Sequence, residues 1–223
     1  RAEANIAYLA KNGYEVEHNL ADLSSVMSMF HSALTSEDFD IPEGHYEEAQ
    51  MKDTVVPNRN AIFSSILYGY ALSVAIREDS NVVIALGVHS GDHAIYPDCR
   101  EEFRDADFEA FKSGNWGADK VSLYTPYLNS TKFGILRDGE KCCDQMHIDF
   151  DSVYEKTNTS YKPIQITGKW YSDYKSASSV ERVEAFIKLQ RKDPVQYADE
   201  GGPVTWEQVV EHVKNILSKH ESA

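Results

Sequence analysis

The sequence predicts an α/β protein built on a doubly wound parallel sheet. Strand-like and helix-like segments alternate along the chain, the order that places parallel strands between crossover helices. The run over residues 81–88 is apolar and of strand length, as expected of a central strand buried on both faces. With 223 residues the chain has the size of one ordinary domain, although its length alone also accommodates two small ones.

The first quarter of the chain predicts two helices, a short strand and a long loop. Residues 2–12 have apolar positions at helical spacing, and Gly13 follows as a stop. Residues 14–20 have the pattern of a short strand, and Asp22 can cap a helix over 23–31. Residues 35–53 are acidic and contain Pro42 and Gly44, so we expect a surface loop of the kind that often serves as a lid.

The remainder predicts five helices and two buried strands. The helices are expected over residues 60–77, 106–113, 130–137, 178–191 and 205–219, the last capped by Thr205, and the strands over 81–88 and 121–125. In doubly wound sheets, ligands bind beyond the carboxyl ends of the strands. This rule directs attention to the loops at 57–60, 89–100 and 125–132.

Composition favours a small-molecule enzyme. Hydrophobic residues make up 42% of the chain, enough for a core, and no run approaches the ~20 apolar residues that span a bilayer. The net charge is −14 and no Lys/Arg cluster stands out, so we expect no direct nucleic-acid binding and no membrane contact. Three cysteines, two of them adjacent, make no disulfide framework, which suits a reducing cytoplasm.

The densest group of reactive side chains follows the first apolar strand, from His89 to Phe103. A Gly turn is followed there by Asp92, Tyr96, Asp98, Cys99 and Arg100. Loops carry both solvation and function, so an ordinary acidic loop bent by Pro97 is the alternative.

A family resemblance rests on this segment and on four others in the same order. The run Tyr96-Pro97-Asp98-Cys99-Arg100-Glu101-Glu102-Phe103 resembles the most characteristic stretch of 7-cyano-7-deazaguanine synthases. Val56-Pro57-Asn58-Arg59-Asn60 is similar to their Val-Pro-Gly-Arg-Asn, with Asn58 in place of Gly. The weaker matches are Ser32–Gly44, Thr125–Leu128 with Lys132, and Arg182–Pro194, so the resemblance covers about Arg1 to Tyr197. The remaining residues, 198–223, are expected to form a C-terminal extension whose amphipathic helix docks on the core or on a second subunit of a homodimer.

The resemblance implies a fold and a reaction. The family belongs to the ATP pyrophosphatase (PP-loop) superfamily, so the sheet is expected to be of the adenine nucleotide alpha hydrolase type. Family enzymes use ATP and Mg²⁺ to adenylate 7-carboxy-7-deazaguanine and then ammonia to form the nitrile base of queuosine biosynthesis. We expect a ligase of this kind. The alternatives are an amide-forming relative and a non-catalytic binding subunit.

Two departures from the family stand out. The superfamily's Ser-Gly-Gly-x-Asp-Ser phosphate loop is absent from the 223 residues, and in relatives it precedes the segment that begins here at Arg1. We therefore expect the first strand and this loop to lie upstream. Relatives also bind a structural zinc through four cysteines, and the matching positions here are Ser160, Asp173, Ser176 and Ser179. Serine hydroxyls are poor zinc ligands, so we expect no zinc there, with Trp170, Tyr171 and Tyr174 holding the segment instead. Cys142, Cys143 and His147 offer a relocated zinc site as the alternative.

The resemblance and side-chain chemistry together imply the roles of the substrate-binding residues. A carboxylate accepts the paired N–H donors of a guanine-like ring, and we favour Asp98 for this, with Asp92 serving the base or a metal. Arg100 is expected to meet the substrate carboxylate, or else to pair with Glu102 on the surface. Tyr96 would stack on the base or pack the loop. Cys99 would contact substrate or be a small buried thiol.

Phosphate contacts are expected from Arg59, Asn60 and Lys132, which lie at helix starts. The expected catalytic set consists of Asp92, Arg59 and Lys132. No metal-ligand set is expected, because His89 and His93 lie in a loop.

Overall fold

Helices and short strands alternate along the computed structural model, which describes residues 1–36 and 40–222. The α-helices are α1 (Ala2–Lys11), α2 (Ser24–Met27), α3 (Arg59–Arg77), α4 (Glu101–Gly114), α5 (Lys132–Gln145), α6 (Phe150–Tyr154), α7 (Ala177–Leu189) and α8 (Trp206–Glu221). The strands are β1 (Val82–Ala85), β2 (Val121–Tyr124), β3 (Ile164–Ile166), β4 (Lys169–Tyr171), β5 (Tyr197–Asp199) and β6 (Gly202–Val204). Short 3-10 helices are η1 (Ala49–Thr54), η2 (Ser90–Asp92), η3 (Pro97–Cys99) and η4 (Ala118–Lys120).

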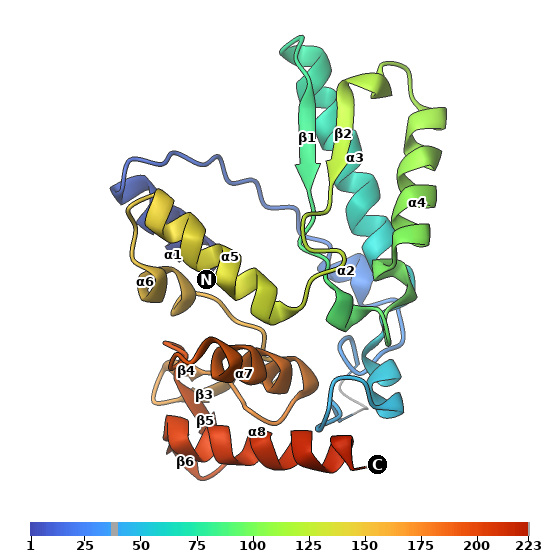
Figure 1. Ribbon diagram of the computed structural model, residues 1–223. Coiled ribbons are helices and arrows are strands. Elements are labelled where there is room, and N and C mark those ends of the chain that lie inside the picture. The colour runs from blue at the N-terminus through green and yellow to red at the C-terminus, as the bar shows by residue number, and fades with distance from the viewer. Residues whose placement is uncertain (37–39, 223) are drawn as a thin grey trace.

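The two central strands form a parallel sheet. β1 pairs with β2 from Val82 opposite Val121 to Ala85 opposite Tyr124. Helix α3 contacts this layer through a buried cluster that includes Tyr68, Ala75 and Ile84, and Phe108 and Phe111 of α4 pack against the same cluster. Figure 1 shows α3 and α4 beside the two strands. The predicted α/β class with a parallel sheet is confirmed. Its doubly wound arrangement stays a prediction, because the described sheet has two strands.

The burial of β1 differs from the prediction. Ile84 is buried, but Val83 is 64% exposed, so this strand is not covered on both faces within the described residues. The helices α3 and α4 pack on the face that carries Ile84. Val83 instead borders a broad groove of about 910 Å³, whose lining also includes Leu20 and Leu23.

Two predictions near the N-terminus are wrong. Residues 14–20 form no strand, and Leu20 is largely exposed. A strand pattern needs a neighbouring strand to pair with, whereas this segment runs beside α3, where Asn19 donates a 2.9 Å hydrogen bond to the hydroxyl of Tyr70. The helix predicted over 23–31 ends at Met27, although Asp22 does accept a 2.9 Å hydrogen bond from the backbone N–H of Ser24 at its start.

The predicted loop over 35–53 packs against the C-terminal half. Residues 37–39 of this prediction lie outside the described residues. Glu43 forms an isolated antiparallel bridge with Ser176, and the backbone N–H of Gly44 donates to the carbonyl of Lys175 at 3.1 Å. The loop ends in η1, where Met51 and Thr54 are buried.

The C-terminal half has its own core around α7. Val180 and Val183 of α7 contact Val209 and Val213 of α8, and all four side chains are fully buried. The predicted Thr205 cap is confirmed, since Thr205 and Gln208 form a reciprocal capping box. Helix α8 therefore docks on the core of its own chain (Figure 1).

A second face of α7 packs on α5. Leu136 and Cys143 of α5 form a buried cluster with Phe150 of α6 and Phe186 of α7. The predicted helices over 106–113 and 130–137 are both longer in the structure, at 101–114 and 132–145. The hairpins β3–β4 and β5–β6 and the helix α6 were not predicted. Within the described ranges, no helix combines the length and apolar character needed to cross a membrane.

Candidate active site

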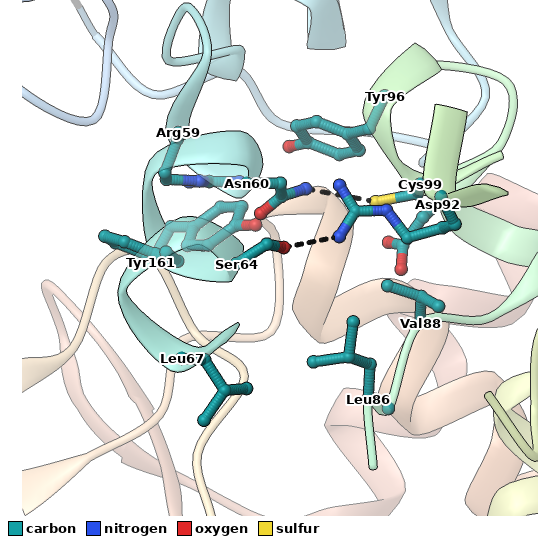
Figure 2. A pocket seen from close by; sticks show the side chains of 13 residues that line it. Arg59, Asn60, Ser64, Leu67, Leu86, Val88, Asp92, Tyr96, Cys99 and Tyr161 are labelled. Atoms are coloured by element: carbon teal, nitrogen blue, oxygen red, sulfur yellow. Dashed lines mark hydrogen bonds between the residues drawn. The ribbon is translucent and has the colours of Figure 1, made fainter. Parts of the chain in front are cut away.

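Two of the three loops that the strand-end rule selects, 57–60 and 89–100, converge on a cavity. It has a volume of about 370 Å³ and lies beyond the carboxyl end of β1. In Figure 2 the apolar side chains of Leu67, Leu86 and Val88 lie opposite Tyr96. The polar and aromatic lining consists of Arg59, Asn60, Phe63, Ser64, Asp92, Tyr96, Cys99, Arg104 and Tyr161.

The start of α3 supplies one wall of this cavity. Asn58 precedes the helix in the left-handed conformation, with φ of 58°. This turn brings the Arg59 guanidinium to 5.8 Å from the ring centre of Tyr96 and lets Asn60 Nδ2 approach Cys99 Sγ at 3.3 Å. Both residues predicted to contact phosphate at this helix start therefore reach the cavity.

Two tyrosines face the opening from different halves of the chain. The hydroxyl of Tyr96 lies 2.5 Å from that of Thr54 at the end of the 35–54 segment. Tyr161 lines the same cavity, and burial raises its pKa, with the neighbouring Tyr96 as the next cause. Tyr96 was predicted from sequence. Tyr161 was missed, although it follows directly on Ser160 in a segment that the resemblance had already aligned.

Cys99 lines the cavity as a buried thiol. Burial raises its pKa to about 12, and the negative charges of Asp92 and Asp98 add to this effect. A thiol with such a pKa is protonated at neutral pH and is a poor nucleophile. The geometry therefore favours a contact over covalent chemistry.

Arg104 is a second site residue that sequence reasoning missed. Its side chain is 2% exposed and lines the cavity, with Nη1 donating to Ser64 Oγ at 2.7 Å. Asp107 lies 4.0 Å from Nη2, but neither Nε nor Nη2 has a hydrogen-bond acceptor among the described residues. An Arg in an acidic helix start ordinarily predicts a surface ion pair, so no local pattern indicates this burial. Unpaired buried guanidinium donors are costly, which makes them candidates for binding an anion.

A second cavity of about 250 Å³ shares Asp92, Tyr96 and Tyr161 with the first. Lys132 lines it at the start of α5 and donates to Glu181 Oε2 at 2.6 Å. The other oxygen of Glu181 lies 3.6 Å from His89 Nδ1, and His89 Nε2 lies 3.5 Å from Asp92 Oδ2. Lys132 and Asp92 were predicted from separate loops. The buried side chains of Glu181 and His89 lie between them, with Glu181 contacting Lys132 and His89 contacting Asp92.

Asp98 and Arg100 are placed differently from the other predicted residues. Neither is among the described residues that line these two cavities. Asp98 is half-buried, whereas Arg100 is exposed and donates from Nε to the carbonyl of His93 at 2.9 Å. The structure therefore brings together Arg59, Asn60, Asp92, Tyr96 and Cys99, with Lys132 beside them.

The four positions matched to zinc cysteines do meet. Asp173 Oδ1 accepts hydrogen bonds from the hydroxyls of Ser160, Ser176 and Ser179 at 2.5, 2.7 and 3.0 Å. Asp173 Oδ2 accepts from the backbone N–H groups of Lys175 and Ser176 at 2.8 and 2.6 Å. All four side chains of this Asp173 cluster are buried.

This donor set does not fit zinc. Both carboxylate oxygens are already occupied by hydrogen bonds, and the other three groups are neutral hydroxyls rather than thiolates. The expectation that aromatic burial holds the segment is wrong in part, since Trp170 is 54% exposed and Tyr171 half-buried. Only Tyr174 is buried, and it also donates to Asp199 Oδ2 at 2.7 Å.

The alternative zinc site is not assembled either. Cys142 is exposed, whereas Cys143 points into the core beside Phe150. Two adjacent helical residues project in different directions, so they do not converge on one ion. The three cysteines are all described, and all are free thiols.

Comparison with known proteins places this site in context. The sequence model of a family described as "Queuosine biosynthesis protein QueC" matches residues 1–190. The 7-cyano-7-deazaguanine synthase 2 of Colwellia psychrerythraea is 42% identical over 188 residues, which cover 84% of this chain and 77% of that protein. The 7-cyano-7-deazaguanine synthase of Pseudoalteromonas translucida is 37% identical over 195 residues, covering 87% and 80%. That of Psychromonas ingrahamii is 40% identical over 185 residues, covering 82% and 75%.

Proposed function

The chain belongs to the queuosine biosynthesis protein QueC family, and from this membership we propose that it is an ATP-dependent 7-cyano-7-deazaguanine synthase. The substrate would be 7-carboxy-7-deazaguanine and the nitrogen donor ammonia. The observation that carries the proposal is the composition of the first cavity, which lies beyond the carboxyl end of β1. Tyr96 and Cys99 of the most specific motif line it, together with Asp92 from the preceding loop and a buried arginine that has unpaired donors.

The chemistry explains why ATP is required. A carboxylate resists attack by ammonia until one of its oxygens becomes a leaving group. Transfer of AMP from ATP to that oxygen releases pyrophosphate, and ammonia then displaces AMP to give the amide. A second adenylation, on the amide oxygen, followed by loss of a proton and AMP gives the nitrile.

Arg104 is the group we assign to the negative charge of the acid or its adenylate. Its guanidinium is desolvated, and a charge-assisted hydrogen bond is strongest in such surroundings. The tyrosines Tyr96 and Tyr161 would hold the flat base, because aromatic faces stack on planar rings. The earlier assignment of the acid to Arg100 becomes the alternative.

Base recognition is assigned to a carboxylate of the motif. We keep Asp98 as the proposed acceptor of the ring N–H donors, with Asp92 as the alternative inside the cavity. Asp98→Asn and Asp92→Asn exchange an acceptor oxygen for a donor without changing the shape. Calorimetry with the acid should show roughly ten- to hundredfold weaker binding for the variant of the true acceptor, and unchanged ATP binding.

Phosphate contacts are assigned to Arg59, Asn60 and Lys132. Arg59 and Asn60 line the first cavity and Lys132 the second, beside Asp92. Mg²⁺ prefers carboxylate oxygens, and Asp92 would hold it; the ion would offset phosphate charge.

The test is product formation by the full-length protein. Incubation with the acid, ATP, Mg²⁺ and ammonia should release AMP and pyrophosphate, and mass spectrometry should show the nitrile. An amide as end product would replace this proposal with the amide-forming alternative. Absence of acid-dependent AMP would overturn both.

A matched pair of variants tests the role of Arg104. Arg104→Met keeps the volume but removes the charge, so the KM for the acid should rise roughly ten- to hundredfold while that for ATP stays unchanged. Arg100→Gln removes a neighbouring exposed arginine and should change neither constant by much. If Arg100→Gln raised the KM for the acid and Arg104→Met did not, Arg100 would be the residue that binds the substrate carboxylate.

A further inference from the structure

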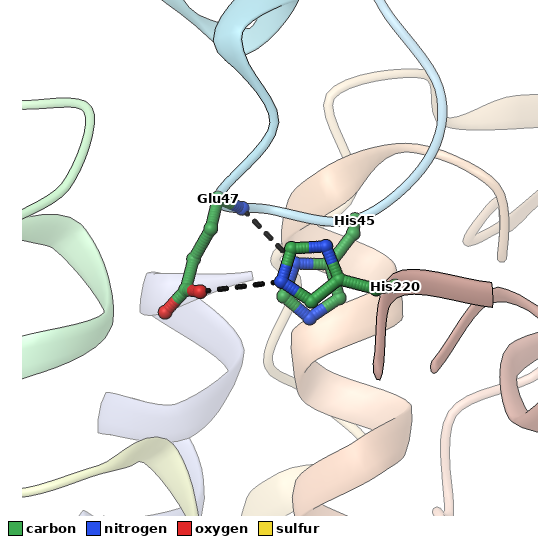
Figure 3. Close-up of side chains that lie close together, drawn as sticks. All are labelled: His45, Glu47 and His220. Atoms are coloured by element: carbon green, nitrogen blue, oxygen red, sulfur yellow. Dashed lines mark hydrogen bonds and ion pairs between the residues drawn. The ribbon is translucent and has the colours of Figure 1, made fainter. Parts of the chain in front are cut away.

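Two histidines and a glutamate from distant parts of the chain meet beside the loop that follows Gly44. They are His45, Glu47 and His220, and one potential ligand atom from each lies within 4.8 Å of the others (Figure 3). Within the described ranges, this is the one group of three such side chains with that spacing. His220 lies outside residues 1–190, which the family match covers.

The loop holds His45 firmly. His45 is 5% exposed, and its backbone N–H donates to Glu48 Oε1 at 3.1 Å. The preceding residue, Gly44, is hydrogen-bonded to the carbonyl of Lys175. The following residue, Tyr46, donates to Glu184 Oε2 of α7 at 3.0 Å.

The other histidine comes from the last turn of α8. That helix is fixed on the core by the fully buried Val209 and Val213. The rings of His45 and His220 stack with their centres 3.6 Å apart and an angle of 7° between their planes. Two independently anchored elements thus bring imidazoles to the same place, so the backbones that carry them need not move when an ion binds.

The nitrogen lone pairs point toward Glu47. His45 Nδ1 accepts a 3.2 Å hydrogen bond from the backbone N–H of Glu47, so it is the deprotonated nitrogen of a neutral ring. His220 Nε2 lies 3.5 Å from Glu47 Oε2 (Figure 3). Two imidazole nitrogens and a carboxylate oxygen therefore lie close together, although the stacked rings hold their in-plane lone pairs parallel rather than convergent.

We propose that His45, Glu47 and His220 bind one divalent transition-metal ion of the zinc or nickel kind. Two imidazoles and a carboxylate form a known zinc donor set, with water completing the coordination. Imidazole nitrogens disfavour Mg²⁺ and Ca²⁺, which prefer oxygen ligands. The net charge of −14 favours attraction of a cation.

To close the site, the ring of His220 must turn out of its stack on His45, because lone pairs in parallel ring planes cannot meet at one ion. Ligand atoms around a tetrahedral zinc lie roughly 3.3 Å apart, given bonds of ~2.0–2.1 Å. The side chains of His220 and Glu47 are 35% and 50% exposed, so both can rotate toward the buried His45. The incoming ion would replace the weak hydrogen bond from the backbone of Glu47.

Metal binding here would tie the end of α8 to the loop that carries Tyr46. Tyr46 lines the second cavity together with Lys132 and Glu181. The ion would therefore stabilise one wall of the candidate active site without contacting the reacting groups. This site is separate from the Asp173 cluster, whose oxygens are already hydrogen-bonded.

Calorimetric titration of the metal-free, full-length protein with ZnCl₂ tests the proposal. One equivalent should bind, and the melting temperature should rise with zinc concentration as linkage requires. His220→Ala and Glu47→Gln each remove an exposed ligand and should weaken binding by at least the ~10–100-fold that loss of a supporting partner costs. Circular dichroism without metal would show that both variants remain folded.

Two controls identify where zinc binds. His212→Gln removes another histidine of α8, which packs against Tyr174, and Cys142→Ser removes the exposed thiol. Both should bind zinc as the unsubstituted protein does. Full affinity in both His220→Ala and Glu47→Gln, loss of binding in Cys142→Ser, or the lack of any saturable binding would each overturn the proposal.

Discussion

At the scale of single residues, Asn58 shows how one backbone angle places two site residues. Its φ of 58° lies in the left-handed region, which glycine enters freely and which asparagine tolerates best among other residues. The resemblance had marked this position as one where the family has Gly. The same turn directs Arg59 and Asn60 into the cavity.

Substitution of Asn58 should follow this backbone requirement. Asn58→Gly should leave the free energy of unfolding nearly unchanged, whereas Asn58→Val should lower it by about 1–2 kcal/mol, because a β-branched residue is strained there. Urea denaturation measures both. Equal stability of the two variants would show that the angle imposes no constraint.

Cys99 gives a prediction about reactivity. Because burial raises its pKa to about 12, only about one thiol in ten thousand is ionised at pH 8, and alkylation should be slow. The fraction of thiolate grows as pH rises toward that pKa, so labelling should accelerate in alkali. Peptide mapping after iodoacetamide treatment at pH 8 should find Cys142 labelled and Cys99 unmodified. Rapid labelling of Cys99 in the folded protein would contradict this.

At the scale of elements, the Asp173 cluster fixes the segment that precedes α7. Five hydrogen bonds to one carboxylate connect Ser160, from the turn before β3, to Ser176 and Ser179 at the start of the helix. Asp173→Asn would replace an acceptor oxygen with a donor that faces other donors.

We expect Asp173→Asn to lower the free energy of unfolding by roughly 2–3 kcal/mol, the loss typical of bonds to a buried charged group. The melting temperature should fall by about 2–4 °C for each kcal/mol. Replacing all four members with cysteine should instead create a site for one zinc, measured by elemental analysis. Asp119→Asn, at an exposed position in η4, is the matched control. If Asp173→Asn left the free energy of unfolding unchanged, the segment would be held by other contacts.

The elements that sequence patterns predicted well are the long ones. The apolar faces of α3 and α8 repeat over many residues, so their limits are nearly those predicted. The strand at 14–20 failed because its pattern does not reveal whether a neighbouring strand exists. The hairpin β3–β4 was not predicted, because its strands have only three residues each. Its turn is formed by Thr167 and Gly168, both with positive φ.

The candidate site was predictable where a motif or the strand-end rule applied. Those two signals found Arg59, Asp92 and Tyr96. They missed Arg104 and Tyr161, because burial and long-range packing place these two, and neither is visible in local sequence. The same reason hid the pairing of His45 with His220.

At the scale of the whole molecule, the site depends on both halves of the chain. The loop after β1 supplies Asp92 and helix α4 supplies Arg104. The C-terminal half supplies Tyr161 and, through α7, the Glu181 that pairs with Lys132. The position of α7 in turn depends on α8, whose Val209 and Val213 are fully buried against it. Residues beyond the family match therefore stabilise elements within it.

Deletion of residues 205–223 tests this dependence. Burying a valine side chain contributes roughly 1.5–3 kcal/mol, so loss of Val209 and Val213 should destabilise the C-terminal half severely. Hydrogen exchange should rise through α7 and the β5–β6 hairpin, while amides of the β1–β2 pair stay protected, since they pack on α3 and α4. Lys214→Ala, on the exposed face of α8, should change neither exchange nor melting. If α8 were only appended to a self-sufficient domain, the truncated protein would melt as the intact one does and keep α7 protected.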